Sequence, residues 1–266
     1  VVSLTENPVK TYLKFGLHYD DLYKSGLLVN FTQKKTFIKN DVTSLDMVLG
    51  DNTRYNLDYY IDNGFYWSFG FKSRLNRFNK NVTTDFNEGQ LLEQLGIKTI
   101  NIDFSDFSNQ FYAQTIFVQK FLLGAGVEHK HLKISSKTTE NIKPVFENSD
   151  YISLLGYIKY DSFDNKYFPK TGWYLTSDFQ YFPYSTNYSK QFNNFSIVKG
   201  DVGFAKTFFK KLSINLQTEA GFAIGEKSVP YFDFVLGGYG YNTINNLRHF
   251  YGYDFLSLAG DSYIKS

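Results

Sequence analysis

The chain has 266 residues, of which 20% are aromatic and none is cysteine, and its formal net charge at pH 7 is +2. The lack of cysteine excludes disulfides and thiolate metal sites, and the dispersed, nearly balanced charge argues against a nucleic-acid surface. No run approaches 18 apolar residues, so the sequence predicts no transmembrane helix. A mean hydropathy of -0.33 still allows a membrane barrel, because only one face of each barrel strand meets lipid.

Alternation with a period of two residues is clearest in the first third of the chain. Leu13, Phe15, Leu17 and Tyr19 share one face of the first predicted strand, opposite Tyr12, Lys14, Gly16 and His18. Further strands are predicted at 27–32, 44–49, 54–61 and 65–74, and the dipeptide Asn63-Gly64 is typical of a tight hairpin before the last of these.

The strand at 65–74 provides a test of which face meets lipid. Phe65, Trp67, Phe69 and Phe71 are expected to face lipid, and Ser68, Gly70, Lys72 and Arg74 the opposite side. Near the bilayer midplane Phe69→Arg would cost about 2 to 4 kcal/mol, whereas Gly70→Arg would act only by crowding.

The pattern weakens from residue 76 to about 109, where we expect a long loop with a possible short helix near 90–95 and a strand-like segment at 99–104. Strands resume at 111–119 and 122–132, and a polar loop runs through Thr139 and Pro144. Later strands are predicted at 151–160, 173–181, 195–208 and 212–224, the third of these with uncertain register. A last strand is expected from Ser257 to the end of the chain.

A specific turn separates the strands at 151–160 and 173–181. Asp161 and Asp164 can bond to nearby backbone groups, Pro169 fixes φ and donates no hydrogen bond, and Gly172 tolerates unusual dihedrals.

The twelve or so antiparallel strands, with short turns and longer loops in alternation, predict an all-β transmembrane antiparallel barrel without a transmembrane helix. A soluble β-sandwich of similar strand count is the alternative.

Several segments resemble the surface-antigen barrels of outer-membrane assembly factors and two-partner secretion transporters. They are the turn with Asp161, Asp164, Phe168, Pro169 and Gly172, and then Phe234-Val-Leu-Gly-Gly238 with its aromatic, glycine-rich loop. In detail Gly16-Leu-His-Tyr-Asp-Asp-Leu-Tyr23 and Asp58-Tyr-Tyr-Ile-Asp-Asn-Gly-Phe-Tyr66 resemble the C-terminal barrel of patatin-like phospholipases of the Bacteroidetes. The resemblance covers nearly the whole chain.

The resemblance implies a barrel of sixteen strands in the bacterial outer membrane, with the Asp161 to Gly172 turn on the periplasmic side between strands eight and nine. The loop from Gly225 to about Phe255 would fold back into the lumen with an Arg-Gly-aromatic tip. Here Leu247-Arg248 is separated from Gly252-Tyr253 by three residues, so either Arg248 supplies the lumenal charge or Tyr251 takes its place. The acidic partners of that arginine would lie on later strands. We therefore expect four closing strands to be missing, residues 1–10 to be a linker from a preceding domain, and residues 11–266 to be the barrel domain.

The residues themselves suggest no catalytic, cofactor or metal site. A patatin-like lipase would need a Gly-x-Ser-x-Gly elbow, which does not occur, so hydrolase activity would belong to a domain before Val1. His129 and His131 could grip a transition metal, but we expect a strand end near the membrane boundary and no carboxylate partner on that face. Asp20-Asp21, like Asp161 and Asp164, is expected to be a turn and not a calcium site. Lys72, Arg74, Asp58, Glu128 and Glu219 would point inward, either as ion pairs or along a water path.

Three functions remain open at this stage. The first is an outer-membrane barrel that anchors or exports an N-terminal passenger, a patatin-like phospholipase by the resemblance. The second is the barrel of an assembly factor whose first and last strands part to admit client strands, and the third is a soluble β-sandwich binding module. The expected partners of the barrel are outer-membrane lipid, its own N-terminal domain and the barrel-assembly machinery, and no nucleic acid.

Overall fold

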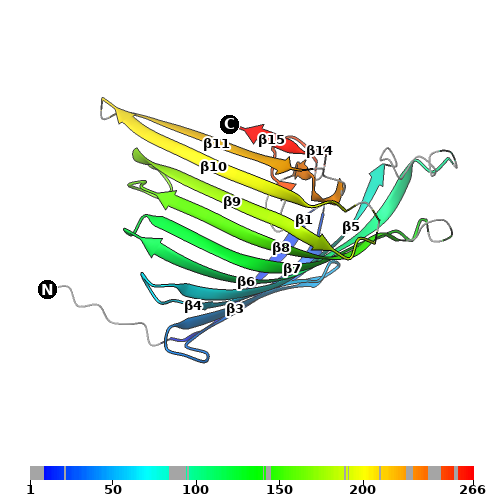
Figure 1. Cartoon of the computed structure of the whole chain (residues 1–266), viewed down its shortest axis with the longest axis horizontal. Coiled ribbons are helices and arrows are strands. Elements are labelled where there is room, and N and C mark those ends of the chain that lie inside the picture. The colour runs from blue at the N-terminus through cyan, green and yellow to red at the C-terminus, as the bar shows by residue number, and fades with distance from the viewer. Residues whose placement is uncertain are drawn as a thin grey trace. The chain divides into compact units, whose positions relative to one another are not determined.

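The computed structural model is all-β and describes residues 9–20, 22–83, 94, 96–139, 141, 145–188, 190, 192–209, 211–225, 230–238, 247–254 and 257–266. Within these residues twelve strands form one sheet in the order β1-β2-β3-β4-β5-β6-β7-β8-β9-β10-β11-β15 (Figure 1). Their bounds are β1 Thr11–Asp20, β2 Lys24–Lys34, β3 Asp41–Gly50, β4 Arg54–Ile61, β5 Ser68–Thr83, β6 Thr99–Phe117, β7 Phe121–Ser135, β8 Val145–Asp161, β9 Thr171–Ser185, β10 Phe195–Phe208, β11 Leu212–Ile224 and β15 Ser262–Lys265. The predicted number of strands is confirmed, and so is the position of the Asp161 to Gly172 turn between strands eight and nine.

The chain divides into two compact units. Unit 1 comprises Val1–Asp62, Gly70–Asn109 and Lys130–Asp150, and unit 2 comprises Asn63–Phe69, Gln110–His129 and Tyr151–Ser266. In unit 1 the first four strands pair as successive antiparallel hairpins, with Leu13 opposite Phe31 and Leu45 opposite Leu57. In unit 2 β8 pairs with β9, β9 with β10 and β10 with β11, and the register of the first pair shifts between Ile152 and Leu154.

The apolar face of the sheet is exposed, as expected of strands that meet lipid. On β1 the side chains of Leu13, Phe15, Leu17 and Tyr19 are all exposed, and Leu17 reaches 88%. In unit 2 the same holds on β11 for Leu212, Ile214, Leu216, Phe222 and Ile224. A water-soluble sheet would bury such rows against a second layer, so the soluble sandwich is not supported.

The strands from β5 to β11 are longer than the roughly ten residues that the membrane pattern predicts. The strands β5 to β11 each have 13 to 19 residues. On β7 the reason is visible, because Val127 is exposed beside buried Glu128, whereas Lys133 is exposed between buried Leu132 and Ile134. Along this strand the exposed face changes from apolar to polar, and the buried face changes from polar to apolar. A single alternation pattern therefore predicts a strand that is too short.

The same reversal explains why the predicted loop at 76–109 is too long, since both of its ends belong to strands. The strand β5 continues to Thr83, and the segments expected at 99–104 and 111–119 are parts of one strand, β6. Most of the possible helix at 90–95 lies outside the described residues, as do residues 1–8 of the expected linker. Packing of inward apolar side chains, such as the stacked rings of Phe78 and Phe104 at 4.6 Å, supports this part of the sheet within unit 1.

Two predicted strand ends also differ. The strand after Asn63-Gly64 begins at Ser68 and not at Phe65, so the connection is wider than a two-residue hairpin. Phe69 is therefore the second residue of β5 and lies near the end of the strand, where an arginine costs about 0 to 1 kcal/mol and not the midplane value. At the C-terminus only Ser262–Lys265 joins the large sheet, whereas Leu258–Gly260 (β14) pairs elsewhere.

An aromatic cluster forms the core of unit 2. The buried rings of Tyr151, Phe182, Phe195 and Phe232 have centroids 4.6 to 6.5 Å apart. Phe232 ends the 3₁₀ turn η2 (Pro230–Phe232), which follows β11 in the chain. The cluster thereby fixes the start of the connection between β11 and β15 against β8, β9 and β10.

Candidate functional site

The connection between β8 and β9 is held by its own side chains. Asp164 Oδ1 accepts hydrogen bonds from the backbone N–H groups of Lys170 and Thr171 at 2.8 and 3.1 Å. Asp161 Oδ1 accepts one from the N–H of Phe163 at 2.9 Å. The expected turn residues are thus brought together, with Pro169 half-buried and Phe168 exposed between them. The periplasmic position of the turn remains a prediction.

Gly172 is the position of this turn that tolerates substitution least. Its φ is 119°, and a Cβ built there would lie 2.4 Å from the carbonyl oxygen of Ser162. Gly172→Ala is expected to destabilise the folded protein by about 1 to 3 kcal/mol, the usual cost of a residue forced into a disfavoured conformation. Urea unfolding in lipid measures this, and Gly156→Ala is the matched control because the nearest atom to its Cβ is 3.9 Å away. Equal midpoints for the two variants would contradict the strain argument.

The turn should also loosen in acid through Asp164. The two backbone N–H groups of Lys170 and Thr171 lower the pKa of Asp164 below its ordinary value of 3.8. A lowered pKa means that the stabilisation is complete above pH 3.8 and is lost as the pH falls through the lowered pKa. In acid, and in Asp164→Asn near neutral pH, exchange of these two amide protons should approach that of unstructured amides. Hydrogen-exchange mass spectrometry measures it, and unchanged protection in Asp164→Asn would refute the role of the carboxylate.

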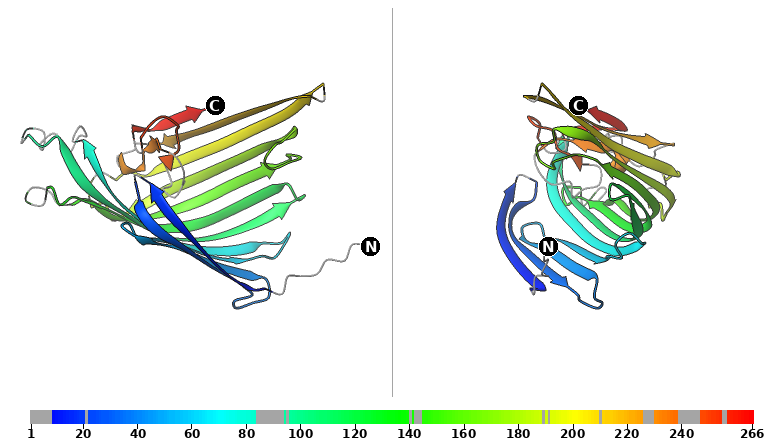
Figure 2. Two further views of the ribbon diagram at one scale, coloured as in Figure 1. Left: turned by 180° about the vertical axis from the view of Figure 1, so that it is seen from behind. Right: turned by 90° about the vertical axis from the view of Figure 1, so that its left-hand side faces the viewer.

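The segment between β11 and β15 forms a small structure of its own. Phe234–Leu236 (β12) lies between Leu247–Arg248 (β13) and Leu258–Gly260 (β14) in a three-stranded sheet. Gly237 and Gly238 follow β12 with φ of 138° and 73°, and their N–H groups donate to the carbonyl oxygens of Arg248 and Tyr253. In Figures 1 and 2 this orange and red segment lies beside β11.

Arg248 attaches this segment to the polar face of β11. Its Nε lies 2.5 Å from Oε1 of Glu219 and 2.9 Å from the hydroxyl oxygen of Tyr263 on β15. The Tyr263 hydroxyl in turn donates to Glu219 at 2.7 Å, so the three side chains form a closed triangle. Of the two expected alternatives it is Arg248 that meets the carboxylate, whereas Tyr251 is 67% exposed and packs its ring against His249.

The carboxylate that meets Arg248 comes before the loop in the chain, whereas the resemblance implies acidic partners on later strands. Glu219 is on the strand before the loop, not on a strand after it, and the following strand contributes the hydroxyl of Tyr263. The sequence places Glu219 on a polar face but carries no signal for its pairing with Arg248, 29 positions away. Gly252, with a φ of 85°, and Tyr253 lie farther along the same segment. Beside Arg248 is a cavity of about 260 Å³ whose lining includes Asp178, Lys199, Asp201 and Gln217.

Three of the other inward charges, Lys72, Arg74 and Asp58, form ion pairs. Lys72 Nζ lies 3.7 Å from Asp58, and Asp106 lies 3.0 Å from Lys130 and 3.7 Å from Arg74. Glu128 accepts a hydrogen bond of 3.0 Å from Gln180 within unit 2. Of the two alternatives, ion pair or water path, Lys72, Arg74 and Asp58 show the ion pair, and Glu128 accepts at least the Gln180 bond. Asp106 and Lys130, both buried, were missed because they lie in the region expected to be a loop and at the end of a short predicted strand.

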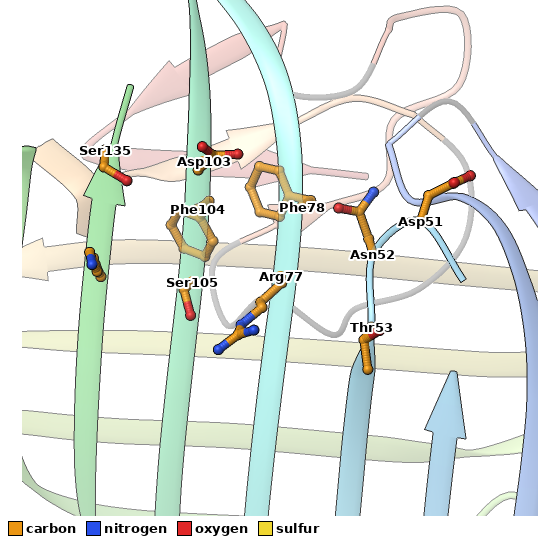
Figure 3. Close-up of a pocket in the computed structure, with 10 residues that line it drawn as sticks. Asp51, Asn52, Thr53, Arg77, Phe78, Asp103, Phe104, Ser105 and Ser135 are labelled. Carbon is orange, nitrogen blue, oxygen red and sulfur yellow. The ribbon is translucent and has the colours of Figure 1, made fainter. Parts of the chain in front are cut away.

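A second cavity, which sequence reasoning missed, lies in unit 1. It has a volume of about 410 Å³, and its lining combines the Phe78 and Phe104 rings with polar side chains (Figure 3). Asp51, Asp103, Arg77 and Lys133 balance one another in charge. A lining whose formal charges cancel favours no charge class of ligand, and we assign none.

Comparison with known proteins agrees with this architecture. A profile described as the OMP85 superfamily matches residues 1–266, the entire chain. The chain belongs to the OMP85 superfamily. The family thus includes this chain with its exposed apolar strand faces and its loop on the polar face, and the predicted surface-antigen resemblance is confirmed at the level of the superfamily. No curated protein matches the sequence.

Among solved structures this OMP85 chain is similar to BamA from Haemophilus ducreyi lacking POTRA domains 1-3. The TM-score is 0.63 at 15% sequence identity, and the match covers 87% of this chain and 45% of that chain. At this identity the likeness shows the fold alone, a transmembrane β-barrel. The chain spans less than half of that protein.

The superfamily member contains no metal site among its described residues, where no three His, Cys, Asp or Glu side chains are grouped. The expectation that His131 lacks a carboxylate partner is wrong, because its Nδ1 lies 3.1 Å from Asp150 on β8. The Asp20 carboxylate lies 2.6 Å from His18 Nε2 and accepts a hydrogen bond from the N–H of Tyr23. Asp21 lies outside the described residues. No α-helix in the described part of the chain has the length and hydropathy needed to cross a bilayer.

Proposed function

We propose that this chain is the outer-membrane barrel domain of a bacterial protein and that it anchors or exports an N-terminal passenger. By the sequence resemblance, the passenger is a patatin-like phospholipase, whose catalytic residues would lie before Val1. The observation that carries the proposal is the attachment of the segment 225–261 to the polar face of β11 through Arg248, Glu219 and Tyr263.

This attachment gives the proposed domain a means of controlling its interior. In a closed barrel the polar face lines the lumen, and a loop fixed there narrows the water path. Two different contacts hold this segment. Phe232 packs in an aromatic cluster, and Arg248 makes a charge-assisted hydrogen bond. The polar contact can be exchanged for water more readily than the buried ring, so we expect the Arg248 end to release first.

The test uses the full-length protein with an epitope tag directly before Val1. An exported passenger makes the tag accessible to antibody on intact cells, and an anchored one only after the outer membrane is permeabilised. A second tag in the turn at 162–170 reports the periplasmic side. If both tags stay inaccessible after permeabilisation, or if the folded chain is extracted without detergent, the proposal fails.

The second candidate is the barrel of an outer-membrane assembly factor, and the fold likeness to BamA favours it. Its partners would be client strands and the barrel-assembly machinery, which would meet the edge strand β1. The gene sequence before Val1 discriminates the two candidates. Several polypeptide-binding repeats would support the assembly factor, and a hydrolase domain with a Gly-x-Ser-x-Gly elbow would support the anchored lipase.

A further inference from the structure

Four successive turns of unit 2 carry large apolar side chains at their tips. They are the connections at 63–67, at 118–120, at 162–170 and at 209 and 211. Their most exposed members are Tyr66, Val118, Tyr167, Phe168 and Phe209. Val118 is 87% exposed and Phe209 is 92% exposed. Turn tips of soluble proteins carry Gly, Asn, Asp and Ser instead, so these residues need a reason.

The backbone conformation makes two of these residues more unusual. Val118 has a φ of 50° and Phe209 a φ of 49°, in the left-handed region where glycine or asparagine is expected. A β-branched residue there is a clear outlier, which costs free energy without any compensating burial in the protein. The sequence thus keeps an apolar side chain at a position where a smaller polar residue would fold more easily.

The four tips lie side by side in one row. Thr115 Oγ1 donates to the carbonyl oxygen of Phe65, and the N–H of Asp161 donates to the carbonyl oxygen of Lys120 at 2.9 Å. Thr207 Oγ1 donates to the carbonyl oxygen of Lys170, also at 2.9 Å. Each of these bonds joins one connection to a residue near the end of a neighbouring strand, β6, β8 or β10. The tips of the β6–β7, β8–β9 and β10–β11 hairpins are at the same side in Figure 1. We call residues 63–67, 118–120, 162–170, 209 and 211 the tip row.

Lysines accompany the aromatic side chains. Lys120, Lys166, Lys170 and Lys211 lie in three of the four connections, and Lys166 Nζ is 5.5 Å from the ring centre of Tyr167. Asp164, the acidic residue nearest these lysines on its turn, is engaged with backbone N–H groups. Aromatic rings prefer the layer between lipid tails and water, and lysines near it are attracted to anionic headgroups.

We propose that the tip row inserts into the headgroup layer of the phospholipid leaflet and concentrates anionic phospholipid around the barrel. Beyond the tip row, Trp173 and Leu212 at the adjoining strand ends are also exposed, so exposed apolar side chains occur both on the tips and on the strands next to them. This inference rests on the proposed function, because it requires that the strands span a membrane. It adds a lipid class and a depth to that function: the turns lie in the interface and do not project into water.

Tryptophan fluorescence tests the depth. The chain has two tryptophans, Trp67 in the tip row and Trp173 just beyond it. Trp173→Phe leaves Trp67 as a native reporter, and Phe209→Trp in a Trp67→Phe, Trp173→Phe background provides a second. The full chain is reconstituted in phosphatidylcholine and phosphatidylglycerol vesicles that contain lipids brominated near the headgroup or deep in the tail. Both reporters should be quenched at least about twofold more by the shallow bromines.

Two controls in the same background separate this inference from the proposed function. Leu216→Trp reports the middle of a strand and should be quenched by the deep bromines, and Lys137→Trp reports a loop at the opposite strand ends. If Leu216→Trp is quenched and both tip reporters are not, the tips face water or a protein domain, and this inference is wrong while the proposed function stands. If Leu216→Trp is not quenched either, the proposed function itself fails.

The lipid class has its own test on the Phe209→Trp reporter. Brominated phosphatidylglycerol should quench it at least about twice as strongly as brominated phosphatidylcholine at equal mole fraction, because each lysine favours anionic lipid several-fold. Replacement of Lys120, Lys166, Lys170 and Lys211 by glutamine should lower that ratio. Equal quenching by the two lipids in the unmodified lysine background would overturn the recruitment of anionic phospholipid.

Discussion

Leu216→Arg should reduce the free energy of unfolding from lipid by about 2 to 4 kcal/mol, the cost of a cation near the bilayer midplane on the lipid face of a barrel. Leu216 is 63% exposed on the apolar face of β11, and it lies opposite Phe204 of β10. It is the fifth residue of a 13-residue strand, which places it well inside the apolar band. Because no water reaches this depth, the guanidinium must either lose its hydration or deform the bilayer.

The adjacent residue provides a matched control. Gln217 lies on the polar face and donates to both carboxylate oxygens of Asp201 at 3.1 Å. Gln217→Arg adds the same charge one position away and can pair with Asp201, so we expect a change within about 0.5 kcal/mol. The fraction of folded protein is measured in lipid vesicles across a urea series by the heat-sensitive mobility shift of the folded band. A Leu216→Arg variant as stable as Gln217→Arg would reverse the assignment of the two faces.

Arg248→Ala should release the loop at 225–261 from the polar face. The alanine leaves Glu219, which is mostly shielded from solvent, without its charged partner, and it breaks the triangle with Tyr263. Hydrogen bonds to charged groups contribute about 1.5 to 3 kcal/mol, so the population of the released loop should rise roughly 10- to 150-fold. We expect faster proteolysis of the loop by thermolysin and a larger conductance of the barrel in planar bilayers.

Two substitutions make the interpretation specific. Arg248→Lys keeps the charge but loses the guanidinium geometry, and its effect should be intermediate. Lys265→Ala removes a bond from Lys265 Nζ to the carbonyl oxygen of His249 in the same region and should change proteolysis little. In the Glu219→Gln background Arg248→Ala should have a much smaller effect, because the two residues share one interaction. Equal rates of loop cleavage in Arg248→Ala and the unmodified protein would show that the loop is held by Phe232 and its small sheet alone.

The membrane-facing strands could be predicted because one face of each strand meets lipid and the other face meets the polar interior. In the first third of the chain Leu13, Phe15 and Leu17 alternate with polar or small residues, and the observed β1 begins and ends within one residue of the predicted strand. The turn from Asp161 to Gly172 could also be predicted, because its residue types suit one conformation and their hydrogen-bond partners lie within the turn. The candidate loop residues were recognised by resemblance, and Arg248 does lie against the polar face of β11.

The predicted strand bounds are wrong where the environment of one strand face changes along the strand. Local alternation and turn residues suffice to predict the strand class and the order of the hairpins, and the composition alone excludes cysteine chemistry. The tertiary structure decided how far β5 to β8 extend, that Asp106 pairs with Lys130, and that Arg248 meets Glu219 and Tyr263. Those outcomes depend on contacts between residues tens of positions apart, whose geometry is set by sheet register and loop folding and leaves no periodic signal in the sequence.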